Sequence, residues 1–247
     1  MTALVAADLL KLRRRNGLWW TTLLLPPAVI VLAFLLAATQ VVELDGGATF
    51  VQDGTDVLAY IAPVLAVLVG ARQGSDEHAA GTLRYQLLTG MPRHRLLFSK
   101  VVVLALACVA VAALGVLANT VCALLLAAKP GDGLAAADVL DGFWNTLIPC
   151  LVYGSIALGV GSLMRNTGPA IAVALMLNIV GVNVVAVLIL IDDALRYVVL
   201  NLGIDRLTFN AASAGDRISL GGAIAVTIAW PAAFILAGWL RLRRLEA

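Results

Sequence analysis

The feature that most constrains this chain is a series of long apolar runs, most of them about 18 residues or longer. A helix needs roughly 20 such residues to cross about 30 Å of hydrocarbon. The runs are continuous, whereas strands of a membrane β-barrel alternate between apolar and polar residues. Of all residues, 62% are hydrophobic and only 13% are charged. The sequence therefore predicts an all-α, polytopic membrane protein and excludes an ordinary soluble domain.

The apolar runs predict six transmembrane helices in a single transmembrane domain that covers residues 1–247. The predicted spans are residues 18–42, 57–71, 97–128, 143–164, 169–191 and 218–240. The second span is short for a membrane helix, so we expect flanking residues to extend it or the bilayer to thin. The third span is longer than needed, and we expect it to tilt or to project into the cytosol.

The distribution of basic residues predicts the orientation of these spans. If the N-terminus is cytosolic, 13 of the 17 Lys and Arg residues fall in segments on the cytosolic side. Cytosolic segments of membrane proteins carry such an excess of positive charge. We therefore expect a multi-pass protein of the cytoplasmic (inner) membrane with both termini in the cytosol.

The N-terminal segment 1–17 is not expected to be a cleaved signal peptide, because the apolar run that follows is too long. It predicts an amphipathic helix that lies on the cytosolic leaflet of the membrane. One side of this helix carries Val5, Leu9 and Leu12, and the opposite side carries Asp8, Lys11 and Arg15. Two roles stay open for it, namely anchoring of the topology and transmission of force.

The polar segment 72–100 separates the second span from the third and is the largest cytosolic feature. Ser75 is expected to cap a short helix that has Asp76 and Glu77 in its first turn. Gly90 and Pro92 are expected to end this helix. Its apolar stripe allows three interpretations: packing on the transmembrane helices, insertion in the lipid interface, or docking into a partner.

Five of the six predicted spans contain no Asp, Glu, Lys, Arg or His, and the third contains only Lys100, as its fourth residue. Carriers driven by ion gradients usually need ionisable residues at depth, so this absence disfavours a secondary carrier. Energy for any transport is therefore expected to come from outside the helix bundle. His78 and His94 both lie in segment 72–100, and neither a catalytic site nor a metal site is expected.

Three asparagines are the main polar side chains at depth in the predicted spans: Asn119, Asn178 and Asn183. Such side chains can join helices by hydrogen bonds or can line a possible substrate path. The outer segment 192–217 is too polar to span the membrane, although part of it is apolar. It predicts re-entrant-like outer helices before the sixth span or, alternatively, an external loop packed on the bundle.

Segment 72–100 also contains an ordered series of residues. The sequence Glu77-His-Ala-Ala-Gly81-Thr82 is followed by Leu87, Leu88, Pro92, Arg95 and Lys100. This series is similar to the E-x-x-x-G-T, L-L, P, R, K progression in permease subunits of type-2 ABC exporters, the ABC-2 family. The six predicted spans, the basic first helix and the outer segment resemble the architecture of that family along essentially the whole chain.

The resemblance implies that segment 72–100 holds a coupling helix that seats in a cleft of a separate ABC ATP-binding subunit. The positions implied in coupling are Glu77, Gly81, Thr82, Leu83, Leu87, Leu88, Pro92 and Arg95. The shorter link 164–167 would make a second, smaller contact. A second permease copy, identical or a sister chain, is expected to complete the transport path.

The chain has no G-x-x-x-x-G-K-[ST] phosphate-binding loop. ATP and Mg are therefore expected in the partner subunit, with no cofactor or metal in this chain and no enzyme activity of its own. The resulting hypothesis is an exporter permease for hydrophobic or amphiphilic cargo, such as a drug, a peptide antibiotic or a lipid-like molecule. The alternative is a non-transporting membrane anchor or sensor whose cytosolic loop binds a regulatory partner.

Overall fold

The computed structural model describes residues 2–14, 16–39, 48–81, 93–126, 135–164, 166–181, 198–208 and 218–244. All regular elements within these ranges are helices, which confirms the all-α prediction. Five of the helices are long and apolar enough to cross a membrane. They are α2 (Asn16–Ala38), α3 (Ala48–Ala79), α5 (Arg93–Leu126), α6 (Ala136–Leu163) and α11 (Leu220–Arg244).

The fifth predicted span is only partly described. Its first half forms α7 (Thr167–Met176), which continues into a π-helical turn, η1 (Leu177–Gly181). Residues 182–191 lie outside the described part of the chain. The multi-pass helical architecture thus agrees with the sequence, while the six-span topology stays a prediction.

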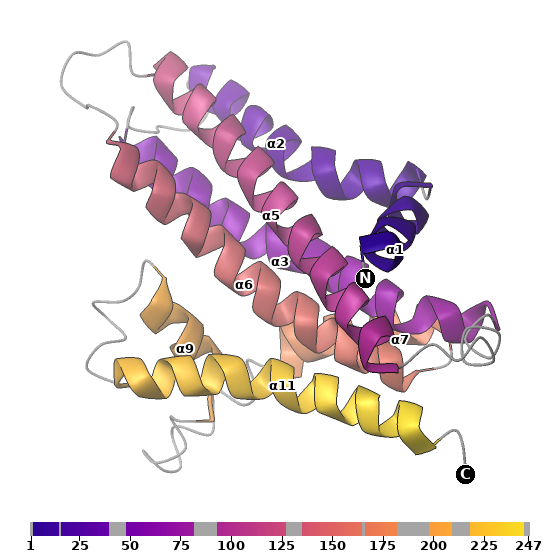
Figure 1. Cartoon of the computed structure of the whole chain (residues 1–247). Coiled ribbons are helices and arrows are strands. Elements are labelled where there is room, and N and C mark those ends of the chain that lie inside the picture. Colours follow the sequence, from indigo (N-terminus) through magenta and orange to yellow (C-terminus); the bar gives the residue numbers. More distant parts are fainter. Residues whose placement is uncertain are drawn as a thin grey trace.

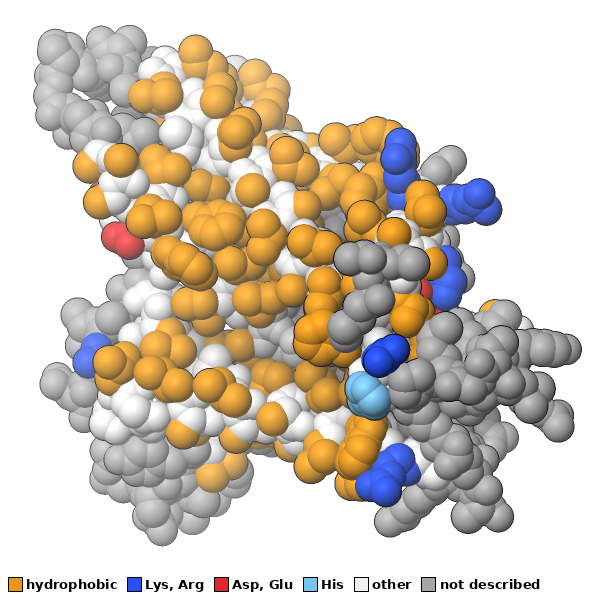
Figure 2. All heavy atoms as spheres, in the orientation of Figure 1, with side chains coloured by type: hydrophobic (Ala, Val, Ile, Leu, Met, Phe, Trp, Pro, Cys, Tyr) orange, Lys and Arg blue, Asp and Glu red, His pale blue; other side chains and the backbone are white. Residues whose placement is uncertain are grey.

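The long helices α3, α5 and α6 run side by side and form the centre of the bundle (Figure 1). The short N-terminal helix α1 (Thr2–Arg14) lies at the same end as the C-terminal part of α11. The other short helix, α9 (Leu200–Leu207), lies at the opposite end. In Figure 2, apolar side chains cover the middle of the visible face, and most of its Lys and Arg side chains gather at the α1 end. This distribution suits a bundle whose middle contacts lipid.

Four glycines bring α3 and α6 into backbone contact, and we call them the glycine seam: Gly70, Gly74, Gly154 and Gly161. A Cβ atom on Gly70 would collide with the carbonyl oxygen of Gly154. One on Gly161 would likewise collide with the carbonyl oxygen of Ala71. Small residues allow such close approach of membrane helices, and backbone-to-backbone packing then stabilises the pair.

The prediction that Ser75 begins a separate helix is wrong. Helix α3 continues without a break through Ser75 and ends at Ala79. Ser75 is fully buried, and its hydroxyl donates a hydrogen bond of 2.9 Å to the carbonyl oxygen of Ala71 one turn earlier. The hydroxyl is therefore satisfied within the helix, while Gly74 packs against α6 and keeps this part of α3 in the bundle. Asp76 and Glu77 consequently lie in the last turn of a helix, where the dipole does not favour them.

The two short helices pack on the bundle. The apolar side of α1 contacts the core through Val5, Leu9 and Leu12, as its periodicity suggests. Its predicted solvent-facing side differs from expectation, because Asp8 and Lys11 bind residues of α3 and α5. At the opposite end, α9 packs on α11. Residues 192–197 and 209–217 lie outside the described chain, so re-entry of this segment into the membrane stays a prediction.

Candidate functional site: a charged junction at the α1 end

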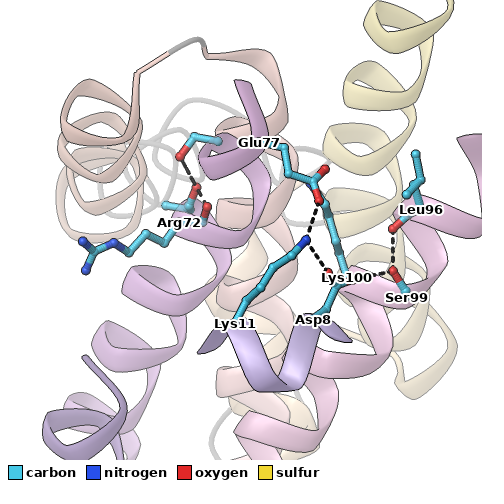
Figure 3. A network of polar contacts seen from close by, with 9 residues as sticks. Asp8, Lys11, Arg72, Glu77, Leu96, Ser99 and Lys100 are labelled. Atoms are coloured by element: carbon cyan, nitrogen blue, oxygen red, sulfur yellow. Dashed lines mark hydrogen bonds and ion pairs between the residues drawn. The ribbon is translucent and has the colours of Figure 1, made fainter. Parts of the chain in front are cut away.

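Glu77 is the central residue of a polar cluster that joins three helices (Figure 3). It lies in the last turn of α3 and is only 7% exposed. Lys100 of α5 approaches its Oε2 atom with Nζ at 2.9 Å, and Lys11 of α1 approaches its Oε1 atom with Nζ at 3.4 Å. One carboxylate therefore binds the first helix of the chain and the start of α5 simultaneously.

Asp8 gives α1 a second attachment to α5. The hydroxyl of Ser99 donates a hydrogen bond of 2.7 Å to Oδ2 of Asp8, and the same hydroxyl lies 2.9 Å from the carbonyl oxygen of Leu96. Lys11 Nζ lies 3.1 Å from Oδ1 of Asp8. We call Asp8, Lys11, Glu77, Ser99 and Lys100 the charged junction. It holds α1 to both of the helices that flank segment 82–92.

The charges of this junction balance, because two carboxylates face two ammonium groups. Glu77 and Lys100 are largely removed from water, with side chains 8% and 12% exposed, so their attraction is weakly screened. Lys11 is more open, with its side chain 57% exposed. Burial alone would lower the pKa of Lys11, but the hydrogen bonds and charges of Asp8 and Glu77 outweigh this effect and raise it.

A cavity of about 360 Å³ lies beside the junction. Its walls come from α1, the start of α2, the end of α3 and the start of α5. The lining residues are Asp8, Lys11, Leu12, Arg14, Leu18, Arg72, Gln73, Asp76, Glu77, Ala80 and Lys100. Figure 3 shows the Arg72 guanidinium directed away from Glu77, so this charge is not part of the junction.

Helix α3 also contacts the start of α7 at this end of the bundle. The Thr167 hydroxyl lies 3.3 Å from Oδ1 of Asp76, within hydrogen-bonding distance. Thr167 is the last residue of the predicted second cytosolic contact, 164–167. Asp76 thus connects segment 72–100 to the link 164–167, the two segments that the resemblance assigns to partner contact.

The remaining predicted coupling residues fall in three groups. Gly81 follows α3 in a turn with a positive φ of 67°, a conformation that favours glycine and ends the helix. Arg95 is exposed in the first turn of α5. The others lie outside the described residues: Thr82, Leu83, Leu87, Leu88 and Pro92.

The asparagines predicted at depth occupy different surroundings. Asn119 of α5 is fully buried, and its Nδ2 atom donates a 2.8 Å hydrogen bond to the carbonyl oxygen of Val51 in α3. Asn178 lies in the π-helical turn η1 and lines a small cavity with Tyr153 and Trp230. Asn183 lies outside the described residues. The two described asparagines therefore have different neighbours, and only Asn178 lines the cavity beside Tyr153 and Trp230.

Sequence reasoning missed the partners of Glu77. Lys100 ends the motif series that Glu77 begins, and opposite charges at the two ends of one loop are a signal that could have paired them. Asp8 and Lys11 gave no such signal, since a charged face on an amphipathic helix is ordinarily solvated. Only the packing of α1 across α5 brings these two residues to Glu77 and Ser99.

Comparison with protein families identifies a family whose model matches this chain. The model of the family described as ABC-2 family transporter protein matches residues 4–191. This range contains α1 from residue 4 onward, α3 and the start of α5, and so includes all the residues of the charged junction. No curated protein matches the chain.

Proposed function

The chain belongs to the ABC-2 family of transporter proteins, and from this premise we propose that it is the permease subunit of an ATP-driven exporter for hydrophobic or amphiphilic cargo. A separate ABC subunit binds ATP and Mg, while this chain forms the path through the cytoplasmic membrane. Both termini lie in the cytosol in this proposal, so the α1 end is the cytosolic end.

The observation that carries the proposal is the position of Glu77 in the charged junction. Segment 82–92, which would contact the ATP-binding subunit, begins shortly after Glu77 and ends directly before α5. Glu77 contacts α5 through Lys100 and α1 through Lys11. A displacement of this segment would therefore move the ends of α3 and α5 together with α1. Energy from the partner would reach the membrane helices by this connection.

A second contact with the ATP-binding subunit is proposed at residues 164–167. The hydrogen bond between Thr167 and Asp76 connects this link to the last turn of α3. Because the glycine seam packs α3 tightly on α6, the two proposed contacts would move as one unit. A force applied at either contact would thus act on the same pair of helices.

The transport path is proposed to form between two permease copies, either identical or sister chains. Within one chain, only 17% of the apolar window in α2 and 17% of that in α11 is buried. These faces leave room for a second permease as well as for lipid. Asn119 is packed between α3 and α5, so among the described asparagines Asn178 is the better candidate for a contact with cargo.

The test is co-expression of the full chain with its cognate ATP-binding subunit, followed by co-purification and measurement of ATP hydrolysis. Leu83→Glu should abolish association, because it places a charge in the apolar stripe of the proposed docking segment. Glu77→Gln should preserve association but reduce the stimulation of hydrolysis by cargo, because the junction is loosened and the docking segment is unchanged. Asp138→Asn, at the opposite end of the bundle, is the matched control and should behave as wild type.

The result that would overturn the proposal is normal association and normal cargo stimulation in the Leu83→Glu chain. Failure of any ATP-binding protein to co-purify with wild type would instead favour a membrane anchor or sensor.

A further inference from the structure

We propose that the cavity beside the charged junction binds the phosphate-bearing headgroup of an anionic lipid from the adjacent membrane leaflet. The cavity lies between α1, the start of α2 and the end of α3, and its volume of about 360 Å³ is within the range of small-molecule sites. This inference concerns a lipid site on the permease itself and does not depend on the identity of the exported cargo.

The cations of the cavity are not all neutralised by the protein. Lys11 and Lys100 are matched by Asp8 and Glu77 in the charged junction. Arg14 and Arg72 also line the cavity, and neither forms an ion pair with a carboxylate of the described residues. Asp76 is the third acid of the lining and is engaged with Thr167. The lining therefore carries an excess positive charge that an anion would balance.

Unsatisfied polar atoms lie in the same wall. Nε of Arg72 and both polar atoms of the Gln73 side chain are buried without a hydrogen-bond partner among the described residues. Buried polar groups are normally paired, because leaving one unpaired costs about 1–3 kcal/mol. A phosphate group offers several acceptor oxygens to guanidinium and amide donors. The two donors, Nε of Arg72 and Nε2 of Gln73, therefore indicate a ligand of that chemistry.

The surroundings favour a lipid as the source of the phosphate. Apolar Leu12 and Leu18 line the cavity together with the charged residues, so a headgroup and the start of an acyl chain could both be accommodated. Trp19 and Trp20 follow directly in α2, and Trp20 is 55% exposed. Tryptophans of this kind mark the boundary between headgroups and hydrocarbon. Basic pockets between membrane helices at this level bind anionic headgroups.

The experiment reconstitutes the full chain into nanodiscs of phosphatidylcholine, with or without phosphatidylglycerol. Bound lipid is counted by native mass spectrometry, and the melting temperature is measured in both bilayers. Wild type should retain phosphatidylglycerol selectively and melt at a higher temperature in its presence. Each of Arg14→Gln and Arg72→Gln should lower this retention about fivefold, since one basic residue at the membrane surface contributes about that factor.

The matched control is Arg13→Gln, because Arg13 is exposed on α1 beside Arg14 but does not line the cavity. This variant should retain phosphatidylglycerol as wild type does. Arg72→Lys should give intermediate retention, because it preserves charge but loses the planar guanidinium. Wild-type melting of the variants in phosphatidylcholine alone would show that they fold.

Three outcomes would overturn the inference. Equal retention of phosphatidylglycerol by wild type and both glutamine variants would show that the cavity does not bind the headgroup. Equal stabilisation of wild type by inorganic phosphate, in nanodiscs without phosphatidylglycerol, would identify a free-phosphate site instead. Loss of the ATP-binding subunit from the variants with unchanged lipid retention would identify a protein contact.

Discussion

Helix α3 contacts its neighbours in two different ways. Along its middle, the glycine seam brings its backbone against that of α6, and Gly70 meets the carbonyl oxygen of Gly154 directly. At its end, Glu77 contacts Lys11 and Lys100 through long side chains. The first interface has no side chain that could adjust, whereas the second consists entirely of side chains with several rotatable bonds. The comparison indicates that α3 and α6 form a rigid pair, while the ends of α1 and α5 are held to α3 by side chains that can rearrange.

The two interfaces also differ in what stabilises them. Close packing contributes many small dispersion contacts that are lost together when the helices separate. A partly buried ion pair gains Coulomb energy but pays for desolvation, so its net contribution is smaller and depends on salt and pH. The glycine seam is therefore expected to set the fold, and the charged junction to set the position of α1.

The largest expected effect comes from adding a single methyl group to the seam. Gly70→Ala should destabilise the protein by about 3 kcal/mol or more, because its Cβ would collide with backbone that cannot move alone. Gly168→Ala is the control, since nothing lies within 4 Å of the position of its Cβ. Thermal unfolding of both variants in detergent measures the difference. Equal stability of the two would contradict backbone-to-backbone packing.

The second largest effect is expected from reversing the charge of Glu77 in the charged junction. Glu77→Lys should destabilise the α1 end by about 2 kcal/mol, less than for a fully buried pair because Lys11 is more than half exposed. Combining it with Lys100→Glu should recover much of this loss by restoring an opposite-charge pair. Unfolding measurements on the four chains of this cycle give the coupling energy between the two residues. A coupling energy near zero would show that the pair does not connect α3 to α5.

A smaller effect is expected from Ser99→Ala. It removes the hydrogen bond to the Asp8 carboxylate and should cost about 1.5 kcal/mol, the lower end of the range for a bond to a charged group, because Asp8 keeps its contact with Lys11. Amide hydrogen exchange in residues 2–14 should accelerate while exchange in α6 stays unchanged. Thr21→Ala is the matched control, because that hydroxyl bonds only to carbonyl oxygens of its own helix. Faster exchange throughout the chain would contradict a junction that is local to α1.

The sequence predicts the membrane class and the helical architecture because both depend on local composition and length. The apolar stripe of α1 and its packing side also follow from periodicity alone. The seam residues Gly154 and Gly161 are visible as small residues in one span, but their partners on α3 require knowledge of which helices pack together. Local pattern thus predicts what kind of surface a helix has and not which helix covers it.

The error at Ser75 has a physical cause. Serine followed by two acids is a common helix start, and segment 72–81 is polar enough to suggest that the membrane helix has ended. In the fold, Gly74 and Ser75 are buried against neighbouring helices, so the helix continues while it still has a surface to pack on. Burial through tertiary contacts outweighs local capping preference. The same continuation places Glu77 within reach of Lys100 and of Lys11, and no local pattern could predict the contact with Lys11.

The smallest predicted effect uses pH to separate the junction from the seam. The pKa of Lys11 is raised above 10.5, its ordinary value, by its contacts with Asp8 and Glu77. A raised pKa means that the folded state binds the proton more tightly than the unfolded state. The contribution of Lys11 is therefore complete below about pH 10.5 and is lost as pH rises through the higher folded value. Docking of α1 should weaken in that window, measured as faster proteolysis within residues 2–14.

Lys11→Arg provides the control for this measurement, because a guanidinium stays charged throughout the same range. The arginine chain should keep α1 protected at a pH where wild type loses protection. The glycine seam contains no titratable group, so the contact between α3 and α6 should not respond in either chain. Loss of α1 protection at the same pH in both chains would contradict control of docking by Lys11.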